Sequence, residues 1–531
     1  ILNMIKNKIY LNNISKFFLY LFPIALVAGP FVAELIMNII SIIFIYLCIK
    51  KKNFNFLKSK YFLYFIIFYI YILINSALSD YTSNIFLKNL FYIRYIIFIF
   101  AVLHIFQFNK EILLNFSKCL FFTLLIVCLD GFLQYFTGEN ILGYEIYRVD
   151  RLSGFFGDDL VLGSYLSKFL PLSIAVFFLN NKSLSKIETV LAITTIFLTF
   201  TLILLSGERS ALLSAVLTII LILIFINSYQ IYRLIFFLVI TLISISVLSF
   251  DKIMLERYFN QTILHLKPIS KSNNFFDNFR YYSPIFETAF KGFKEKKFIG
   301  QGAKSFRYFC DKQGLETFFN EKMRVSFINN EQLSFTGDWK IKNIKIEKIY
   351  FKEGEHIKKG DIFLSYSDKK NFSFFNLSRK EKLIDFVSNR SGIVNKIHVK
   401  ETEIISGSAN LAEIKITDKN ISKQEKIRHN GCTTHPHQYY LQLLSETGFL
   451  GFFYIFSIFI IFSFKLINNA YNKIIYKKII FNNYQICLII NIIVLLWPIT
   501  TNGDFFNNWN NMLMLLPIAA YLDSKKNYYA D

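Results

Sequence analysis

Residues 187–227 read IETVLAITTIFLTFTLILLSGERSALLSAVLTIILILIFIN, two long apolar runs separated by the short polar turn SGERS. Each run has about the length that a helix needs to cross roughly 30 Å of hydrocarbon. The polar turn then lies at a membrane surface, between two spans that cross the bilayer in opposite directions. This stretch predicts an all-α polytopic membrane protein.

Apolar runs of the same kind occur through both ends of the chain. The 531 residues are 54% hydrophobic and include 62 phenylalanines, and the mean hydropathy is +0.40. This composition excludes an ordinary soluble protein. We predict about twelve transmembrane helices, near residues 14–30, 33–49, 61–78, 88–107, 114–135, 160–180, 187–206, 211–227, 231–250, 447–466, 478–498 and 508–524.

Lysine-rich segments precede the first predicted span and follow the second, the sixth, the tenth and the last, as in KKKNFNFLKSK at residues 50–60. Because Lys and Arg in short loops stay on the cytoplasmic side, we predict that both termini are cytoplasmic. The turn SGERS and the long segment from about 251 to 445 then lie outside. That segment is basic, but long loops are exempt from the charge rule. Its charge suits anionic lipid headgroups or phosphorylated glycolipids, and nucleic acid is not an expected partner.

Within the long segment, residues 335–417 change to short alternating strands with glycine turns. The sequences EKIYFKEGEHIKKGDIFLSY and NKIHVKETEIISGSANLAEI form a weak repeat about 48 residues apart. This pattern resembles the biotinyl/lipoyl-like barrel-sandwich fold of periplasmic adaptor proteins, with SDKKNFSFFNLSRKEKLIDF as an inserted hairpin. The resemblance implies a docking or spacer module that binds an envelope protein, rather than a lysine that carries a cofactor at Lys369.

These observations divide the chain into five parts. They are a transmembrane bundle (1–250), a first helical part of the outer loop (251–334), the small β barrel-sandwich insert (335–417), a second part of the loop (418–446) and the C-terminal transmembrane helices (447–531). Cys310 and Cys432 are the two cysteines of the outer segment, and an oxidising compartment favours a disulfide between them. The alternative is a zinc site that uses Cys432, His435 and His437.

Several polar residues at the predicted outer surface could do chemistry. Arg209 lies in the turn SGERS, Arg151 precedes the sixth span, and Arg280 precedes an amphipathic helix that ends in a turn at Gly300 and Gly302. Each could instead be an ordinary surface arginine, or one that reaches lipid phosphate from a helix end.

The histidine motif HPHQYY, residues 435–440, precedes the tenth span. Because Pro436 keeps the preceding residue extended, a helix is expected to start near His437, with an interruption at Gly448. The imidazole of His437 could take a proton from a hydroxyl, or it could be a structural hydrogen-bonding group.

In combination these segments resemble the O-antigen ligase and polymerase family of bacterial envelope glycosyltransferases. The resemblance rests on RLSGFFGDDLVLGSYL (151–166), SGERSA, the segment after Arg280, and HPHQYYLQLLSETGFLGF (435–452). It covers nearly the whole chain except the β insert. Gln438 departs from the family, which often has Asn there, and the insert leaves open how an acceptor reaches the site.

The resemblance implies transfer of a glycan from polyprenyl diphosphate to lipid A core, or to another glycan acceptor, at the periplasmic face of the inner membrane. Arg209 and Arg280 would bind the diphosphate and His437 would activate the acceptor, with inversion at the sugar and without a metal or another cofactor. Arg151, His435 and Glu446 would bind substrate or orient an imidazole. Consistent with a metal-free site, no Asp-x-Asp pair occurs in the predicted outer segments.

Other functions remain open at this stage. A polymerase of the same superfamily and a protein O-glycan ligase differ from the ligase only in their acceptor. A polysaccharide transporter would place its ionisable residues near the middle of the bilayer, whereas most of the candidates lie at the outer surface. An envelope scaffold would use the β insert and have no catalytic centre.

Overall fold

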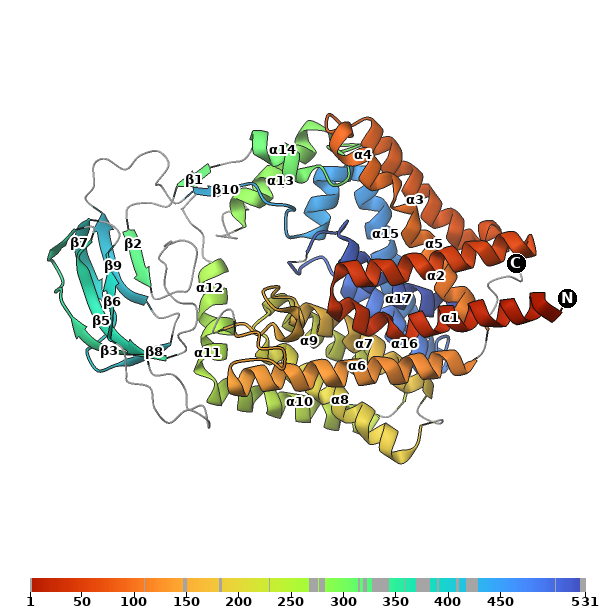
Figure 1. Ribbon diagram of the computed structural model, residues 1–531, viewed down its shortest axis with the longest axis horizontal. Helices are drawn as coiled ribbons and strands as arrows, with labels where there is room; N and C mark the ends of the chain where they lie inside the picture. The colour runs from red at the N-terminus through yellow and green to blue at the C-terminus, as the bar shows by residue number, and fades with distance from the viewer. Residues whose placement is uncertain are drawn as a thin grey trace.

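The computed structural model describes residues 2–108, 110–146, 150–180, 184–228, 230–266, 276, 282–313, 316–318, 322–326, 343–358, 360–368, 383–388, 391–406, 410–416, 428–501 and 503–525. Most of these residues form a bundle of apolar helices, and the strands lie apart from the bundle at one end (Figure 1). The mainly helical fold with small sheets agrees with the predicted class.

Nine helices in the described part of the chain are long and apolar enough to cross a membrane, with α4 and α5 counted as one. They are α1 (Leu2–Ala28), α2 (Pro30–Lys51), α3 (Lys60–Ala77), α4 (Thr82–Leu90) with α5 (Ile93–Phe106), α6 (Lys110–Thr137), α7 (Leu162–Asn180), α8 (Lys186–Leu205), α10 (Gln230–Phe250) and α15 (Tyr439–Ile475). The protein is therefore a multi-pass membrane protein.

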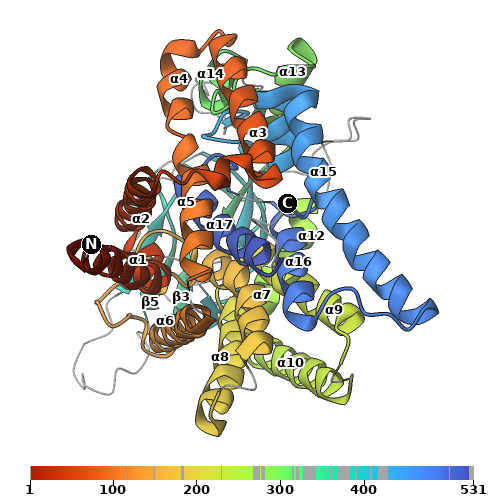
Figure 2. The ribbon, with the colours of Figure 1, turned by 90° about the vertical axis from the view of Figure 1, so that its right-hand side faces the viewer.

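Three further helices of the bundle are shorter. They are α9 (Arg209–Phe225), α16 (Asn483–Leu495) and α17 (Asn508–Asp523). Each of the twelve predicted ranges overlaps a helix of the bundle, but the number of helices that cross the membrane stays a prediction. Figure 2 shows α5, α7, α16 and α17 in the middle of the bundle, where most of their side chains are buried.

Short helices cover one end of the bundle. They are α11 (Lys252–Leu255), α12 (Gln261–Leu266), α13 (Ser283–Glu295) and α14 (Phe306–Gln313). The predicted amphipathic helix is α13, whose buried face includes Ile285, Phe286 and Ala289. Its apolar residues pack with Phe306 and Cys310 of α14, which fixes α14 beside the loop that carries the histidines.

The amphipathic helix leads to the predicted glycine turn, and this turn completes the hydrogen bonding of a break in α15. Gly448 has φ 62° and ψ −166°, so the helix is interrupted there as expected. The carbonyl groups of Ser445 and Glu446 accept hydrogen bonds from the backbone N–H groups of Gln301 (2.9 Å) and Gly302 (2.8 Å). The two sequence motifs therefore hold each other in place.

The predicted start of this helix is wrong by two residues. His437 has φ 58°, a left-handed conformation that no α-helix contains, and α15 begins at Tyr439. Gln438 is the N-cap, and its side-chain oxygen accepts the N–H of Leu441 at 2.6 Å. His437 therefore lies in the loop before the helix rather than on a helix face with Leu441.

The β segment forms two four-stranded antiparallel sheets, ordered β2-β9-β7-β4 and β6-β5-β3-β8. A pair of short strands, β1 (Glu316–Phe318) and β10 (Arg428–Asn430), joins the two ends of the segment. The other strands are β2 (Lys322–Ser326), β3 (Asn343–Ile349), β4 (His356–Ile357), β5 (Ile362–Asp368), β6 (Leu383–Val387), β7 (Gly392–Ile397), β8 (Ile404–Ser406) and β9 (Asn410–Ile416).

The sequence repeat is visible in this arrangement. Strands β8 and β9 begin at residues 404 and 410, each 48 residues after β4 and β5 at 356 and 362. The first half contains β3, β4 and β5, and the second contains β7, β8 and β9. The short strand of each half pairs with a strand of the other half, since β4 pairs with β7 and β8 pairs with β3. A shared apolar core that includes Ile346, Phe363 and Leu411 lies between the sheets.

The finer prediction for this segment is not confirmed. In the described part of the chain no strand pair joins the two sheets into a barrel, so the lipoyl-like resemblance stays a prediction. One sheet also takes in β2, which precedes the predicted boundary at 335. Most of the predicted inserted hairpin lies outside the described residues.

Candidate active site

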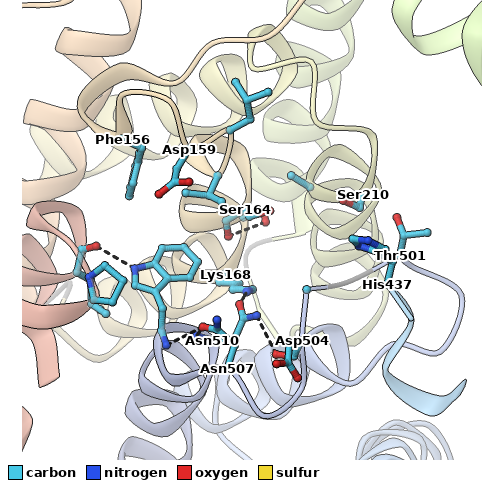
Figure 3. Close-up of a pocket in the computed structure, with 18 of the residues that line it drawn as sticks. Phe156, Asp159, Ser164, Lys168, Ser210, His437, Thr501, Asp504, Asn507 and Asn510 are labelled. Atoms are coloured by element: carbon cyan, nitrogen blue, oxygen red, sulfur yellow. Dashed lines mark hydrogen bonds between the residues drawn. The ribbon is translucent and has the colours of Figure 1, made fainter. Parts of the chain in front are cut away.

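A cavity of about 930 Å³ lies at the end of the bundle where α1 ends and several helices begin. Its wall includes Ser164 from the first turn of α7, Ser210 from α9, and Asn507 and Asn510 at the start of α17. His437 reaches it from the loop before α15 (Figure 3). Part of the apolar wall comes from the α1–α2 junction, where Gly29 has φ 123° and separates the two helices.

Four helices thus begin around one cavity, namely α7, α9, α15 and α17. The N-terminus of a helix carries roughly half a positive charge, because its first backbone N–H groups have no partner within the helix. The N-termini of α15 and α17 are capped by neutral side chains, because Gln438 and Asn507 accept hydrogen bonds from N–H groups of the first turn. The start of α7 is instead capped by the carboxylate of Glu208, so the starts of α15 and α17 are the ones that favour an anionic ligand.

The two histidines of the motif both line the cavity, and their rings lie 4.2 Å apart between centroids. The ring of Tyr282 lies 5.7 Å from that of His437. Burial and, to a smaller extent, the neighbouring His435 together lower the pKa of His437 to about 4. His437 is therefore a neutral imidazole at neutral pH, with a lone pair that can accept a proton.

His435 is held differently from His437. Its Nδ1 is 2.9 Å from the hydroxyl of Thr434, whereas its buried Nε2 has no hydrogen-bond partner among the described residues. Burial lowers its pKa, the nearby Asp504 raises it, and Arg307 lowers it. An unpaired buried nitrogen at the cavity wall can accept or donate one hydrogen bond to a bound molecule.

A disulfide fixes the loop that carries the histidines. Cys310 of α14 and Cys432 are bonded, with Cα atoms 4.8 Å apart. Cys432 therefore does not supply a thiolate for the zinc site that was the alternative. Among the residues that the structure describes, no three His, Cys, Asp or Glu side chains are grouped as metal ligands.

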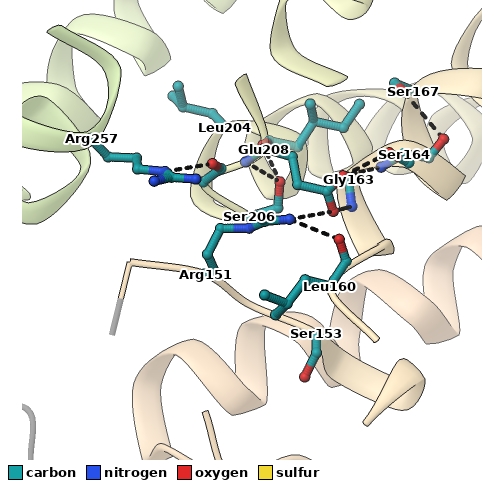
Figure 4. Close-up of polar contacts among 12 residues, drawn as sticks. Arg151, Ser153, Leu160, Gly163, Ser164, Ser167, Leu204, Ser206, Glu208 and Arg257 are labelled. Atoms are coloured by element: carbon teal, nitrogen blue, oxygen red, sulfur yellow. Dashed lines mark hydrogen bonds and ion pairs between the residues drawn. The ribbon is translucent and has the colours of Figure 1, made fainter. Parts of the chain in front are cut away.

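Arg151 also lines the cavity, and Glu208 holds it there (Figure 4). The guanidinium lies 3.9 Å from the Glu208 carboxylate and donates to the carbonyl of Leu160 at 2.8 Å. Glu208 also accepts the backbone N–H groups of Gly163 (2.8 Å) and Ser164 (3.1 Å) at the start of α7. Burial raises the pKa of Glu208, and Arg151 opposes that rise.

A second ion pair lies beside the first. Arg257, in a wide turn between α11 and α12, is 3.1 Å from the carboxylate of Asp150 and donates to the carbonyl of Gly207. Gly207 has φ 67°, and a Cβ there would collide with the backbone carbonyl of Asp150. The RLSGFF and SGERS motifs, remote in sequence, are thereby packed against one another.

The structure does not bring every predicted site residue to the cavity wall. Arg209, the first residue of α9, donates instead to the hydroxyl of Thr262 in α12 at 3.4 Å. Arg280 lies outside the described residues. Glu446 is 1% exposed and accepts hydrogen bonds from the backbone of Phe306 and the side chain of Gln442. Glu446 therefore contacts neither imidazole, and its local role is to hold α14 against α15.

The residues of the cavity wall that sequence reasoning missed include Lys168, Asp504, Trp509 and Asn510. A lysine within an apolar span is costly unless it has a role, so Lys168 could have been singled out from the sequence. Nothing in the local pattern distinguishes the other three, because the fold brings α17 to the cavity from the far end of the chain. Glu208 was also missed, although it is part of the quoted turn SGERS.

Comparison with known protein families covers part of the chain. Residues 194–333 match the O-antigen ligase family model. The match contains Arg209, Glu208 and Arg257 but ends before the histidine motif. A search of curated proteins gave no match. The O-antigen ligase match supports a member of the ligase and polymerase superfamily, and at this coarse level it supports an enzyme of glycan transfer.

Proposed function

We propose that this protein is a glycosyltransferase that moves a glycan from polyprenyl diphosphate to an acceptor hydroxyl. The observation that carries the proposal is one cavity at the end of a membrane bundle, lined by a neutral His437 and surrounded by four helix N-termini. The O-antigen ligase match over residues 194–333 supports the same reaction class.

The chemistry needs a base for the acceptor and positive charge for the leaving group. The acceptor oxygen attacks the anomeric carbon while its proton passes to the imidazole of His437. The bond from that carbon to the phosphate oxygen breaks, and the diphosphate leaves with the electron pair. Attack from the face opposite the leaving group inverts the anomeric centre. The N-termini of α15 and α17, which have neutral caps, supply positive potential where negative charge develops, and Arg151, which is paired with Glu208, can donate a hydrogen bond to the substrate.

The predicted arginine pair remains part of this proposal. Arg209 is adjacent to Ser210, which lines the cavity, and a bidentate guanidinium suits a diphosphate. We propose that Arg209 and Arg280 bind the diphosphate when the donor is present, and that His435 contacts the acceptor or donor through its unpaired nitrogen.

The location of the cavity suits a reaction on the outer side of a bacterial inner membrane. The helix α1 begins at the opposite end of the bundle and ends beside the cavity. With the N-terminus in the cytoplasm, as the lysine pattern predicts, the cavity opens toward the periplasm. The acceptor would be lipid A core or another glycan, and the β segment would bind an envelope protein.

The direct test is transfer by the purified protein from polyprenyl diphosphate glycan to lipid A core, with a chelator present. His437→Ala is expected to lower kcat by about 10²–10⁴-fold, while His356→Ala, at an exposed position of strand β4, changes nothing. Arg209→Ala and Arg280→Ala are expected to weaken donor use, with Arg→Lys variants in between. Full activity of His437→Ala, or inhibition by chelator that zinc reverses, would contradict the proposal.

The acceptor distinguishes the ligase from the polymerase of the same superfamily. In a deletion strain, a ligase defect leaves lipid-linked polymer intact and the core uncapped. A polymerase defect leaves cores capped with a single repeat unit. The first result is the one that we expect.

A further inference from the structure

Lys168 brings a positive charge into the membrane bundle at the wall of the cavity. It lies six residues into α7, roughly 9 Å below the start of that helix at 1.5 Å per residue. Its ammonium group donates to the side-chain oxygen of Asn510 and lies 5.4 Å from the centre of the Trp509 ring. Figure 3 shows Lys168 of α7 beside Asn510 of α17.

This lysine differs from two buried arginines near the cavity, because it forms no ion pair with a carboxylate of the described residues, although Glu208 acts on it electrostatically from beyond ion-pair distance. Arg151 has Glu208 and Arg257 has Asp150, whereas no carboxylate in the described part of the chain forms an ion pair with Lys168. Arg307 also lines the cavity, but it is exposed to solvent. A cation held in a partly buried site without a carboxylate costs free energy, which a bound anion would recover.

The surroundings of Lys168 are fixed in a way that suits such an anion. Asn510 donates its amide N–H to the carbonyl of Asp504 at 3.1 Å, so its oxygen must face the lysine. The indole N–H of Trp509 donates to the carbonyl of Leu26 at 2.9 Å, which fixes the ring under the ammonium. Asn507 caps the first turn of α17, so a positive helix end also faces this part of the cavity.

We propose that Lys168, positioned by Asn510 and Trp509, binds an anionic oxygen group of the lipid-linked donor. The inference rests on the proposed function and adds to it a cation that lines the cavity and forms no ion pair with the described carboxylates. The anion is either the diphosphate or the carboxylate of an acidic sugar in the glycan. Both present charged oxygens to a single ammonium, which acts as a point charge with up to three donors.

The chain offers a matched control. Lys465 of α15 also donates to a neutral side chain, the hydroxyl of Tyr521, and lies 4.7 Å from the centre of the Phe462 ring. It does not line the cavity. Lys465→Gln therefore removes a lysine of the same kind, from a similar aromatic setting, without touching the proposed anion site.

The test uses calorimetry to measure how tightly the purified full-length protein in detergent binds three ligands, namely farnesyl diphosphate, farnesol and glucuronate. Lys168→Gln is expected to weaken the affinity for farnesyl diphosphate by about tenfold or more, which is the usual loss when a charged hydrogen bond is removed. Farnesol binding should stay unchanged, Lys168→Arg should restore part of the affinity, and Lys465→Gln should behave as wild type. A selective loss of glucuronate binding instead would support the acidic sugar as the source of the anion.

A second variant tests the charge without removing the lysine. Asn510→Asp has the same shape and places a carboxylate against the ammonium, so binding of both anions should fall more than binding of farnesol. The substitution also removes the donor to the Asp504 carbonyl, so the midpoint of thermal unfolding is measured beside it. Unchanged affinities for both anions in Lys168→Gln and Asn510→Asp would overturn the inference. So would an equal loss for farnesol and farnesyl diphosphate, which indicates a purely structural lysine.

The transfer assay separates this inference from the proposed function. If wild type transfers glycan and Lys168→Gln does so with the same KM for the donor, the inference fails alone. If wild type transfers nothing but binds farnesyl diphosphate through Lys168, the proposed function fails and the anion site stands.

Discussion

His437 combines a left-handed backbone with a half-buried ring in the loop before α15. The backbone conformation turns the side chain away from α15, and burial keeps the imidazole neutral. A neutral imidazole is the form that a general base needs. The same burial makes it a weak base in the empty site, and a bound diphosphate anion would raise its pKa.

The pH dependence of transfer follows from this lowered pKa. Protonation removes the lone pair, so activity falls only as the pH drops toward the pKa of about 4 rather than near 6.5. We expect kcat/KM, which reports the free enzyme, to be constant from pH 7 to about 5 and to fall below that. An acid limb centred near 6.5 would contradict the assignment. Since His435 lowers the pKa of His437, His435→Asn should move the limb to higher pH.

Glu208 acts through the residues that it holds. Its carboxylate accepts two backbone N–H groups and the Ser164 hydroxyl, and it neutralises Arg151. Glu208→Gln turns an acceptor into a group with two donors, which leaves at least one buried donor unpaired. We expect a loss of roughly 3 kcal/mol in the free energy of unfolding, measured by thermal or denaturant unfolding in detergent.

The control for Glu208 is a carboxylate at the surface. Asp80 is 67% exposed at its side chain and pairs with Lys296 at 2.8 Å. Exposed pairs contribute about 0–1 kcal/mol, so Asp80→Asn should change the unfolding midpoint little. An equal effect of the two substitutions would show that Glu208 is not a buried anchor.

At the scale of elements, the break in α15 depends on a residue without a side chain. Gly448 adopts φ 62° and ψ −166°, a region that only glycine occupies readily. A Cβ there would also collide with the backbone of Phe298. Gly448→Ala should therefore lower the unfolding midpoint and displace the turn at Gly300.

Gly354 gives the comparison for this prediction. It has φ 90° in a turn of the β segment, and a methyl group added at its Cα would meet open space. Gly354→Ala therefore tests backbone strain alone, which should lower the free energy of unfolding by about 1 kcal/mol. The difference between the two midpoints measures the packing of the turn against α15, and equal midpoints would contradict the described fit.

The disulfide joins two elements across a separation of 122 residues. Closing a loop of that length stabilises the fold by roughly 4–5 kcal/mol in the chain-entropy model. We expect Cys310→Ala with Cys432→Ala to lower the unfolding midpoint and to weaken transfer, because the loop with His435 and His437 follows Cys432 directly. Unchanged activity after reduction would show that the loop is held by other contacts.

The helices could be predicted closely because apolar runs mark them directly. The predicted span 187–206 corresponds to α8, Lys186–Leu205, and the predicted turn follows directly after this helix in the structure. The start of α15 was misplaced because a positive φ at His437 leaves no trace in the apolar pattern. Lys168, Asp504 and Asn510 meet only through packing of α7 against α17, and that contact cannot be read from either segment alone.

At the scale of the whole molecule, the β segment leaves and rejoins the helical part at one point. Phe318 of β1 lies opposite Arg428 of β10 in register. Replacing residues 319–427 with an Asn-Gly turn, which suits a two-residue hairpin, should therefore leave the fold and in vitro transfer intact. The measurement is unfolding and transfer beside the full chain. Loss of transfer in a folded protein would mean that the β segment contributes to substrate binding.

The reciprocal exchange of short strands has a consequence for the stability of fragments of the β segment. Since each repeat completes the sheet of its twin, neither repeat has a finished structure without the other. Fragments cut between the repeats should be insoluble alone and should recover order only when mixed.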